Sequence, residues 1–267
     1  MRRGVLLTVT LLGLVAVSGH GFWSRHLGQQ SIWQPPGPLR FLVYLAVAGA
    51  WFGAWILARP AWLIPSTLAL VTIYSMAAVG VLPVAAVAFF LFACFVLGRL
   101  IFPPGDLFRG PVPDLLCLLA GISAVMWLAA LLAHYPVNYP AAWLGILAVP
   151  VLASPQTTRR CLRTLAAMWR PVAWGGRREY AALAIALAPL LAHWLVVLKP
   201  EVSVDALSMH LVVPAYVANH HAWSFDFRHV TWAVMPMGAV WCYTVTYLLG
   251  GEFAARLLNF ALLTALC

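Results

Sequence analysis

The sequence is a succession of long apolar runs, each of which ends near a proline, a glycine or a charged residue. A helix needs about 20 consecutive apolar residues to cross the hydrocarbon core of a bilayer, so runs of this length predict membrane-spanning helices. Their apolar character is continuous rather than alternating, which argues against a transmembrane β-barrel. We therefore predict an all-α, polytopic transmembrane helical bundle of about 8–9 spans. Besides a first run within residues 5–17, the expected spans lie at 41–58, 61–80, 82–98, 115–133, 141–152, 181–198, 232–250 and 253–267.

The composition excludes several other classes of protein. Apolar residues make up 64% of the chain and charged residues 9%, whereas soluble domains have about 45–50% and 25%. A chain this apolar is neither an ordinary soluble domain nor a disordered one. Sixteen Lys and Arg against seven Asp and Glu give a net charge of +9. These basic residues are scattered between the apolar runs, as topology signals are, so no nucleic-acid partner is predicted.

The positions of the basic residues predict which loops face the cytoplasm. Lys and Arg concentrate in cytoplasmic loops. If Met1 is cytoplasmic, the predicted spans place Arg59, segment 99–114 and the arginine-rich segment 153–180 inside, and segment 199–231 outside. The densest arginine cluster therefore faces the cytoplasmic leaflet, where we expect contact with membrane lipids.

Three parts of the chain follow from this interpretation. Residues 1–152 form an N-terminal transmembrane block of about six helices, 153–180 a basic cytoplasmic loop, and 181–267 the start of a second module. Residues 1–19 fit either a cleaved signal peptide or an uncleaved first helix, and we favour the helix. The apolar run that ends at Cys267 predicts that the second module is truncated.

The outward loop 199–231 carries the most informative polar residues. Glu201 and Asp205 are two of only seven acids, and His210 follows them. If Ser203 caps a short interfacial helix, Asp205 lies in its first turn, and Pro214 bends or ends that helix. An acid that complements a helix dipole is one interpretation of Asp205. A functional acid at the membrane edge is the other.

The same loop resembles a known family. Residues 205–211 read Asp-Ala-Leu-Ser-Met-His-Leu, a proline and a tyrosine follow at 214 and 216, and Met-Pro-Met-Gly opens a span at 235. This pattern resembles the first outward loop of bacterial GT-C-type integral membrane glycosyltransferases, and more distantly the protein mannosyltransferase and aminoarabinose transferase group. The resemblance covers about residues 181–267, and Met209 departs from it by replacing the usual tyrosine.

The resemblance implies a function and a place in the cell. It implies an enzyme of a bacterial inner membrane that transfers a sugar from a polyprenyl-phosphate donor, outside the cytoplasm. Asp205 matches the family's acidic residue and would act as the catalytic base, or would help to hold a divalent metal ion in members that use one. Glu201 is a second catalytic candidate, and His210 lies within the motif as a substrate-binding candidate.

The remaining candidates in the loop bind substrate or lipid. Lys199 and Arg228 are the cations that can meet a lipid phosphate, although interface cations often only snorkel. The spacing of the loop's histidines gives no metal-binding signature, so no metal site is predicted. Two other classes stay open: a transporter or flippase of lipid-linked precursors, which predicts broken helices, and a non-catalytic membrane scaffold, which tolerates loss of both Glu201 and Asp205.

Overall fold

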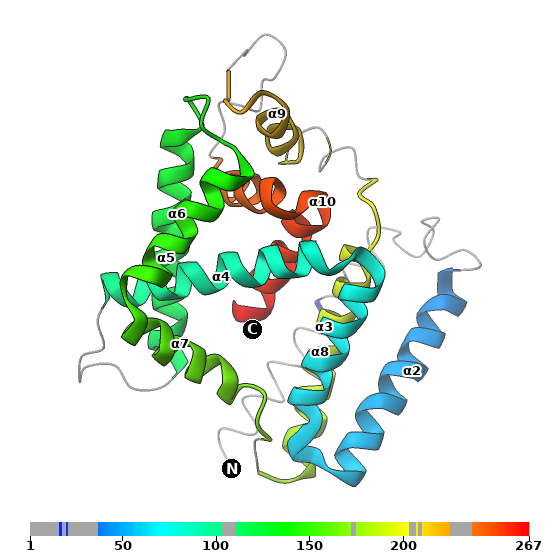
Figure 1. Cartoon of the computed structure of the whole chain (residues 1–267). Coiled ribbons are helices and arrows are strands. Elements are labelled where there is room, and N and C mark those ends of the chain that lie inside the picture. The colour runs from blue at the N-terminus through cyan, green and yellow to red at the C-terminus, as the bar shows by residue number, and fades with distance from the viewer. Residues whose placement is uncertain are drawn as a thin grey trace. The chain divides into compact units, whose positions relative to one another are not determined.

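The computed structural model describes residues 16–17, 20, 37–102, 111–171, 175–202, 207, 210–224 and 237–266. Within these residues the chain is helical and contains no strand, which confirms the predicted all-α class. Contacts divide the chain into a unit Met1–Ala54 and a unit Trp55–Cys267, and the core and the cavities described below lie in the second. The helices, shown in Figure 1, are α2 (Gly37–Ala58), η3 (Pro60–Trp62), α3 (Leu63–Val79), α4 (Val81–Ile101), α5 (Pro111–Leu132), α6 (Pro140–Ala153), α7 (Pro155–Ala167), α8 (Arg177–Val197), α9 (Val212–His220) and α10 (Gly238–Leu266).

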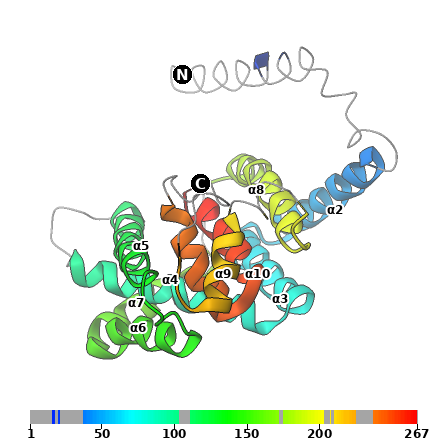
Figure 2. The same ribbon diagram turned by 90° about the horizontal axis from the view of Figure 1, so that it is seen from above.

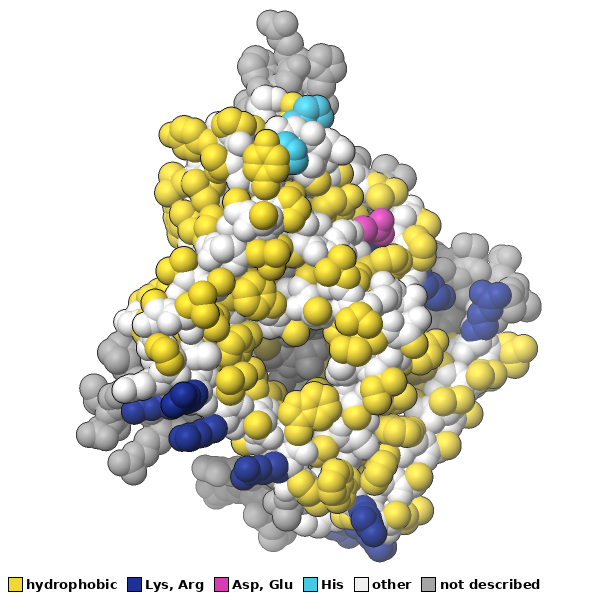
Figure 3. Space-filling model, in the orientation of Figure 1, with side chains coloured by type: hydrophobic (Ala, Val, Ile, Leu, Met, Phe, Trp, Pro, Cys, Tyr) yellow, Lys and Arg dark blue, Asp and Glu magenta, His cyan; other side chains and the backbone are white. Residues whose placement is uncertain are grey.

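The protein is a multi-pass membrane protein. Among the described residues, six helices have the length and hydropathy to cross a bilayer: α2, η3 with α3, α4, α5, α8 and α10. Many large apolar side chains on them face outward, including Ile73 (67% exposed), Leu131 (63%) and Ile185 (76%). Apolar side chains also dominate the face in Figure 3. Exposed apolar surface on this scale requires lipid around it.

Three expected spans take forms that the apolar runs alone did not define. The run at 141–152 forms α6, whose 14 residues include Pro150. The runs at 232–250 and 253–267 meet in α10, which is interrupted at Gly251 by a non-helical φ of 74°. Glycine adopts this backbone region without the penalty of a Cβ. The predicted division between the last two spans therefore coincides with a break in α10.

The core of the larger unit forms where α4 crosses α5 and where α10 packs on both. The crossing of α4 and α5 depends on two glycines. A Cβ at Gly98 would overlap the Cys117 carbonyl oxygen, and a Cβ at Gly121 would overlap the Cys94 carbonyl oxygen. Such small residues let two membrane helices approach to backbone contact. Because α10 rests on this crossing, its side chains are held in place by the N-terminal block.

The segment between α8 and α10 contains a short helix, as predicted, but the role of Pro214 is different. The residues from 203 to 206, with the predicted Ser203 cap, lie outside the described residues. The helix α9 begins at Val212, so Pro214 lies in its first turn and neither bends nor ends it. Proline is tolerated there because first-turn N–H groups have no partner within the helix. Figures 1 and 2 both show α9 lying against α10.

Candidate functional site

An open cavity of about 280 Å³ lies between α10 and the segment that joins α8 to α9. The joining segment supplies Glu201, His210 and Leu211 to its wall. The rest comes from α10, on both sides of the break at Gly251. The cavity therefore combines a polar wall with an apolar one, which is typical of small-molecule sites. The polar lining side chains are Glu201, His210, Tyr243, Arg256 and Asn259.

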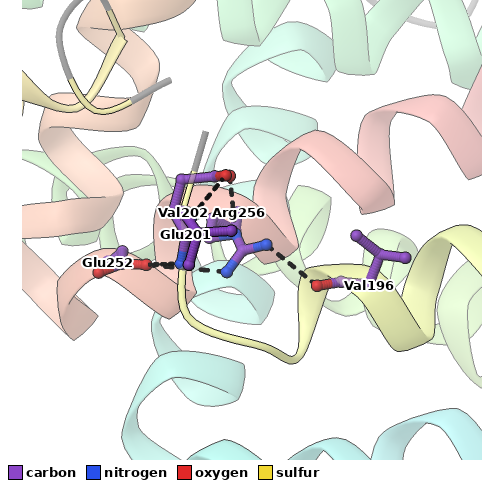
Figure 4. Close-up of polar contacts among 5 residues, drawn as sticks. All are labelled: Val196, Glu201, Val202, Glu252 and Arg256. Carbon is purple, nitrogen blue, oxygen red and sulfur yellow. Dashed lines mark hydrogen bonds and ion pairs between the residues drawn. The ribbon is translucent and has the colours of Figure 1, made fainter. Parts of the chain in front are cut away.

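A buried arginine organises the polar wall (Figure 4). Only 10% of the Arg256 side chain is exposed. Its Nε lies 3.5 Å from Glu201 Oε2, and its Nη1 lies 3.7 Å from Glu252 Oε1. Its Nη2 donates a hydrogen bond of 3.0 Å to the carbonyl oxygen of Val196, at the end of α8. The guanidinium thus ties α10 to the end of α8 and to the loop that follows.

The two carboxylates are also tied to each other. The backbone N–H of Glu201 donates a hydrogen bond of 2.8 Å to Glu252 Oε1. Glu252 therefore fixes the backbone of Glu201 while it pairs with Arg256. The three side chains carry a formal charge of −1 when both acids are ionised. A cluster with that charge suits hydroxyl groups or a cation better than an isolated phosphate.

One donor of this cluster remains without a hydrogen bond. Among the described residues, Arg256 Nη1 is buried and has no hydrogen-bond partner, because Glu252 Oε1 lies beyond hydrogen-bond distance. A buried donor without an acceptor is costly, and a bound ligand or water that supplies the acceptor is one explanation for it. Arg256 lines the cavity, but Nη1 itself has almost no exposed surface, so a bound molecule meets other atoms of the side chain unless its neighbours move.

A second open cavity, of about 440 Å³, lies between α9 and α10. Tyr216 and His220 of α9 line it, together with Tyr247 and Glu252 of α10. Leu211 borders both cavities. Glu252 therefore faces the second cavity and at the same time pairs with the arginine of the first. This arrangement provides two adjoining spaces that share one carboxylate cluster.

The loop between α5 and α6 holds α9 in place through Asn138. This side chain is 2% exposed, and its Nδ2 lies within 3.0 Å of the carbonyl oxygens of Leu132, Tyr135 and His221. Its Oδ1 accepts a hydrogen bond of 3.2 Å from Trp143 Nε1. His221 ends α9 in the left-handed region and stacks on Tyr139. The N-terminal block thus positions the helix that covers the second cavity.

We expect Asn138→Ala to lower the free energy of unfolding by about 3 kcal/mol, because a buried indole N–H and backbone carbonyls lose their partner. The measurement is thermal unfolding of the purified protein in detergent. Asn219→Ala is the matched control, since the Asn219 side chain is exposed and donates to the Ala215 carbonyl oxygen of its own helix. That control should change stability by less than about 0.5 kcal/mol. Equal effects of the two variants on stability would contradict the role of Asn138 in holding α9 in place.

The structure brings together two of the five predicted site residues. Glu201 and His210 both line the first cavity. Lys199 is exposed just after the end of α8 and is not part of the lining of either cavity. Asp205 and Arg228 lie outside the described residues. Within the described part of the chain, no group of three His, Cys, Asp or Glu is placed to hold a metal ion.

Sequence reasoning missed Glu252 and Arg256. Arg256 lies in the run at 253–267, which was interpreted only as an apolar span, and Glu252 lies between that run and the one at 232–250. The two side chains form an ion pair four residues apart. An acid and a base at this spacing share one face of a helix. Ionisable residues inside a membrane segment usually mark function. That combination, directly after the glycines at 250 and 251, was the available signal.

Comparison with protein families, with curated proteins and with solved structures finds no match to this chain.

Proposed function

We propose that this protein is a membrane glycosyltransferase that moves a sugar from a polyprenyl-phosphate donor to an acceptor at the two cavities beside α9 and α10. The observation that carries the proposal is the partly buried Glu201–Arg256–Glu252 cluster, whose members line the two cavities next to the segment that bears the family-like motif. The motif adds Asp205, and the exposed apolar helix faces offer a surface to a polyprenyl tail.

The cluster supplies hydrogen-bonding groups suited to a sugar. The Glu201 carboxylate accepts hydrogen bonds from hydroxyl groups, while the Arg256 guanidinium and the Asn259 amide donate to sugar oxygens. The formal charge of −1 favours a neutral sugar in this place. The donor phosphate then binds a cation outside the cluster. Lys199 and Arg228 are the candidate cations in the loop.

Asp205 takes the role of general base in this proposal, and Glu201 that of a positioning residue. A base accepts the proton of the acceptor hydroxyl as that oxygen attacks the anomeric carbon, while the bond to the donor phosphate breaks. Glu201 Oε2 lies 3.5 Å from Arg256 Nε. We therefore assign Glu201 the role of holding the substrate and the arginine in position. We place the reaction outside the cytoplasm of a bacterium, with Met1 on the cytoplasmic side.

The experiment is transfer of a labelled sugar from a polyprenyl-phosphate donor in membranes that contain the protein. We expect Asp205→Asn to lower the transfer rate about 100-fold, the usual contribution of a positioned base. Glu179→Gln is the control, because Glu179 lies at the start of α8, where it accepts the backbone N–H of Gly176, and it lines neither cavity. Unchanged transfer by Asp205→Asn in correctly folded protein would overturn the role of Asp205.

A transporter or flippase of lipid-linked precursors is the second candidate, and one observation favours it. The break in α10 at Gly251 stands beside Glu252 and Arg256, and broken helices with charged residues are typical of transporters. Vesicles that contain the protein and a fluorescent polyprenyl-phosphate sugar distinguish the two functions. Movement of the lipid across the bilayer without formation of a glycosidic bond would favour transport over transfer.

A further inference from the structure

The helix α7 packs at the ends of three apolar helices. Cys161 of α7 is buried in a cluster with Phe95, Val96 and Cys117, against which Val151 also packs. Phe95 and Val96 lie in the last two turns of α4, Cys117 in the second turn of α5, and Val151 in the last turn of α6. These three helices all end or begin at this level, so α7 lies at an edge of the apolar zone rather than within it.

The two faces of α7 differ sharply. Cys161 is 2% exposed, whereas Arg159, Arg160 and Arg163 are all exposed. In a helix with 3.6 residues per turn, Cys161 and Arg163 project to nearly opposite sides. Leu162 projects between these faces and is 50% exposed. A helix with one packed face, one arginine face and an exposed apolar border suits the boundary between headgroups and acyl chains.

The surroundings of α7 extend the same pattern. Met168 and Trp169 follow the helix and are 53% and 48% exposed, and Arg170 follows them. The only acid in residues 153–180 is Glu179, and its carboxylate already accepts the Gly176 N–H at 2.8 Å. The arginine face therefore has no neutralising acid in this segment. Lys and Arg side chains gather along the lower edge of the molecule, including the region over α7 (Figure 3).

We propose that α7 is an interfacial helix whose arginine face binds the phosphate groups of anionic phospholipids in the adjacent leaflet. Arg159, Arg160 and Arg163 donate charge-assisted hydrogen bonds to the lipid phosphates, and Leu162 and Trp169 lie among the upper acyl chains. The lipid anchors the junction between α6 and α8. This inference does not depend on the glycosyltransferase assignment, because it concerns a different surface and needs no reaction.

The test places a fluorophore on α7 in the full chain in lipid nanodiscs. Ala166→Cys introduces a thiol on the exposed side, one turn from Leu162, and Cys267→Ser removes a competing thiol. The described cysteines are buried, and burial raises the pKa of the Cys161 thiol more than Arg99 lowers it, so labelling at neutral pH favours position 166. Quenching of this fluorophore by spin-labelled phosphatidylglycerol is then compared with its quenching by spin-labelled phosphatidylcholine.

We expect at least about a fivefold preference for phosphatidylglycerol, which is the effect of a single basic residue at an anionic surface. The preference should fall as salt rises, since exposed charges are screened. In the triple variant R159Q/R160Q/R163Q, the two spin-labelled lipids should quench the fluorophore equally. In R159K/R160K/R163K, most of the preference for phosphatidylglycerol should remain. Equal quenching of the original sequence by the two lipids, or quenching by neither, would overturn the proposal. The dependence of this preference on salt concentration is measured without arginine substitutions. It therefore tests the proposal even if the glutamine variant unfolds.

Discussion

Replacement of Arg256 by glutamine is expected to lower the rate of sugar transfer by about 10²–10³-fold, the loss that follows removal of one preorganised donor from an active site. It is also expected to lower the free energy of unfolding by about 3 kcal/mol. We take this value from the lower end of the range for breaking a buried ion pair, because 34% of the Glu252 side chain is exposed. The physical reason is that Glu201 and Glu252 lose the cation between them, and the Val196 carbonyl at the end of α8 loses its donor.

A double variant separates the two effects. Glu252→Gln combined with Arg256→Gln removes one charge of each sign, so stability should partly recover while transfer stays low. Arg256→Lys should keep more stability than transfer, because an ammonium cannot reproduce the planar fork of a guanidinium. Arg99→Gln is the matched control. It breaks the ion pair with Asp114, which lies away from both cavities, so transfer per folded molecule should not change. Loss of transfer in proportion to unfolding, for all of these variants, would contradict a substrate contact by Arg256.

The spans could be predicted from the sequence because bilayer thickness constrains each segment locally. The run expected at 82–98 is α4, Val81–Ile101, and the run expected at 181–198 is α8, Arg177–Val197. Their ends move by a few residues because a helix extends to the nearest residue that stops it, such as Gly80 before α4. The inner break at Gly251 followed from the same local information, since charge and glycine interrupt the apolar run there.

The candidate site could be predicted only in part because its contacts cross long distances in the sequence. Glu201 was recognised as a scarce acid, but its pairing with Arg256 joins residues 55 positions apart (256 − 201). Asn138 holds α9 in place through a hydrogen bond to the carbonyl oxygen of His221, which is 83 residues later in the sequence. Helical spacing reveals that Glu252 and Arg256 share a face. It contains no information about which loop folds against that face.

The largest structural effect is expected from Gly121→Leu, which should prevent α4 and α5 from crossing at backbone contact. Even Gly121→Ala should cost about 3 kcal/mol or more, because its Cβ would overlap the Cys94 carbonyl oxygen, and a backbone atom yields only if a whole helix shifts. The measurement is thermal unfolding in detergent, with sugar transfer as a second readout, since α10 and its cavity rest on this crossing.

Gly145→Ala in α6 is the matched control, because a Cβ there meets nothing within 4 Å. Replacing a helical glycine with alanine in open space stabilises a helix by about 0.5–1 kcal/mol, so this control should change stability in the opposite direction. Gly98→Ala should resemble Gly121→Ala, since its Cβ would overlap the Cys117 carbonyl oxygen in the same crossing. The two together should cost less than the sum of the single changes, because either one alone already separates the helices. Additive effects, or a stable Gly121→Leu protein with normal transfer, would show that the close approach of α4 and α5 does not hold the cavity in place.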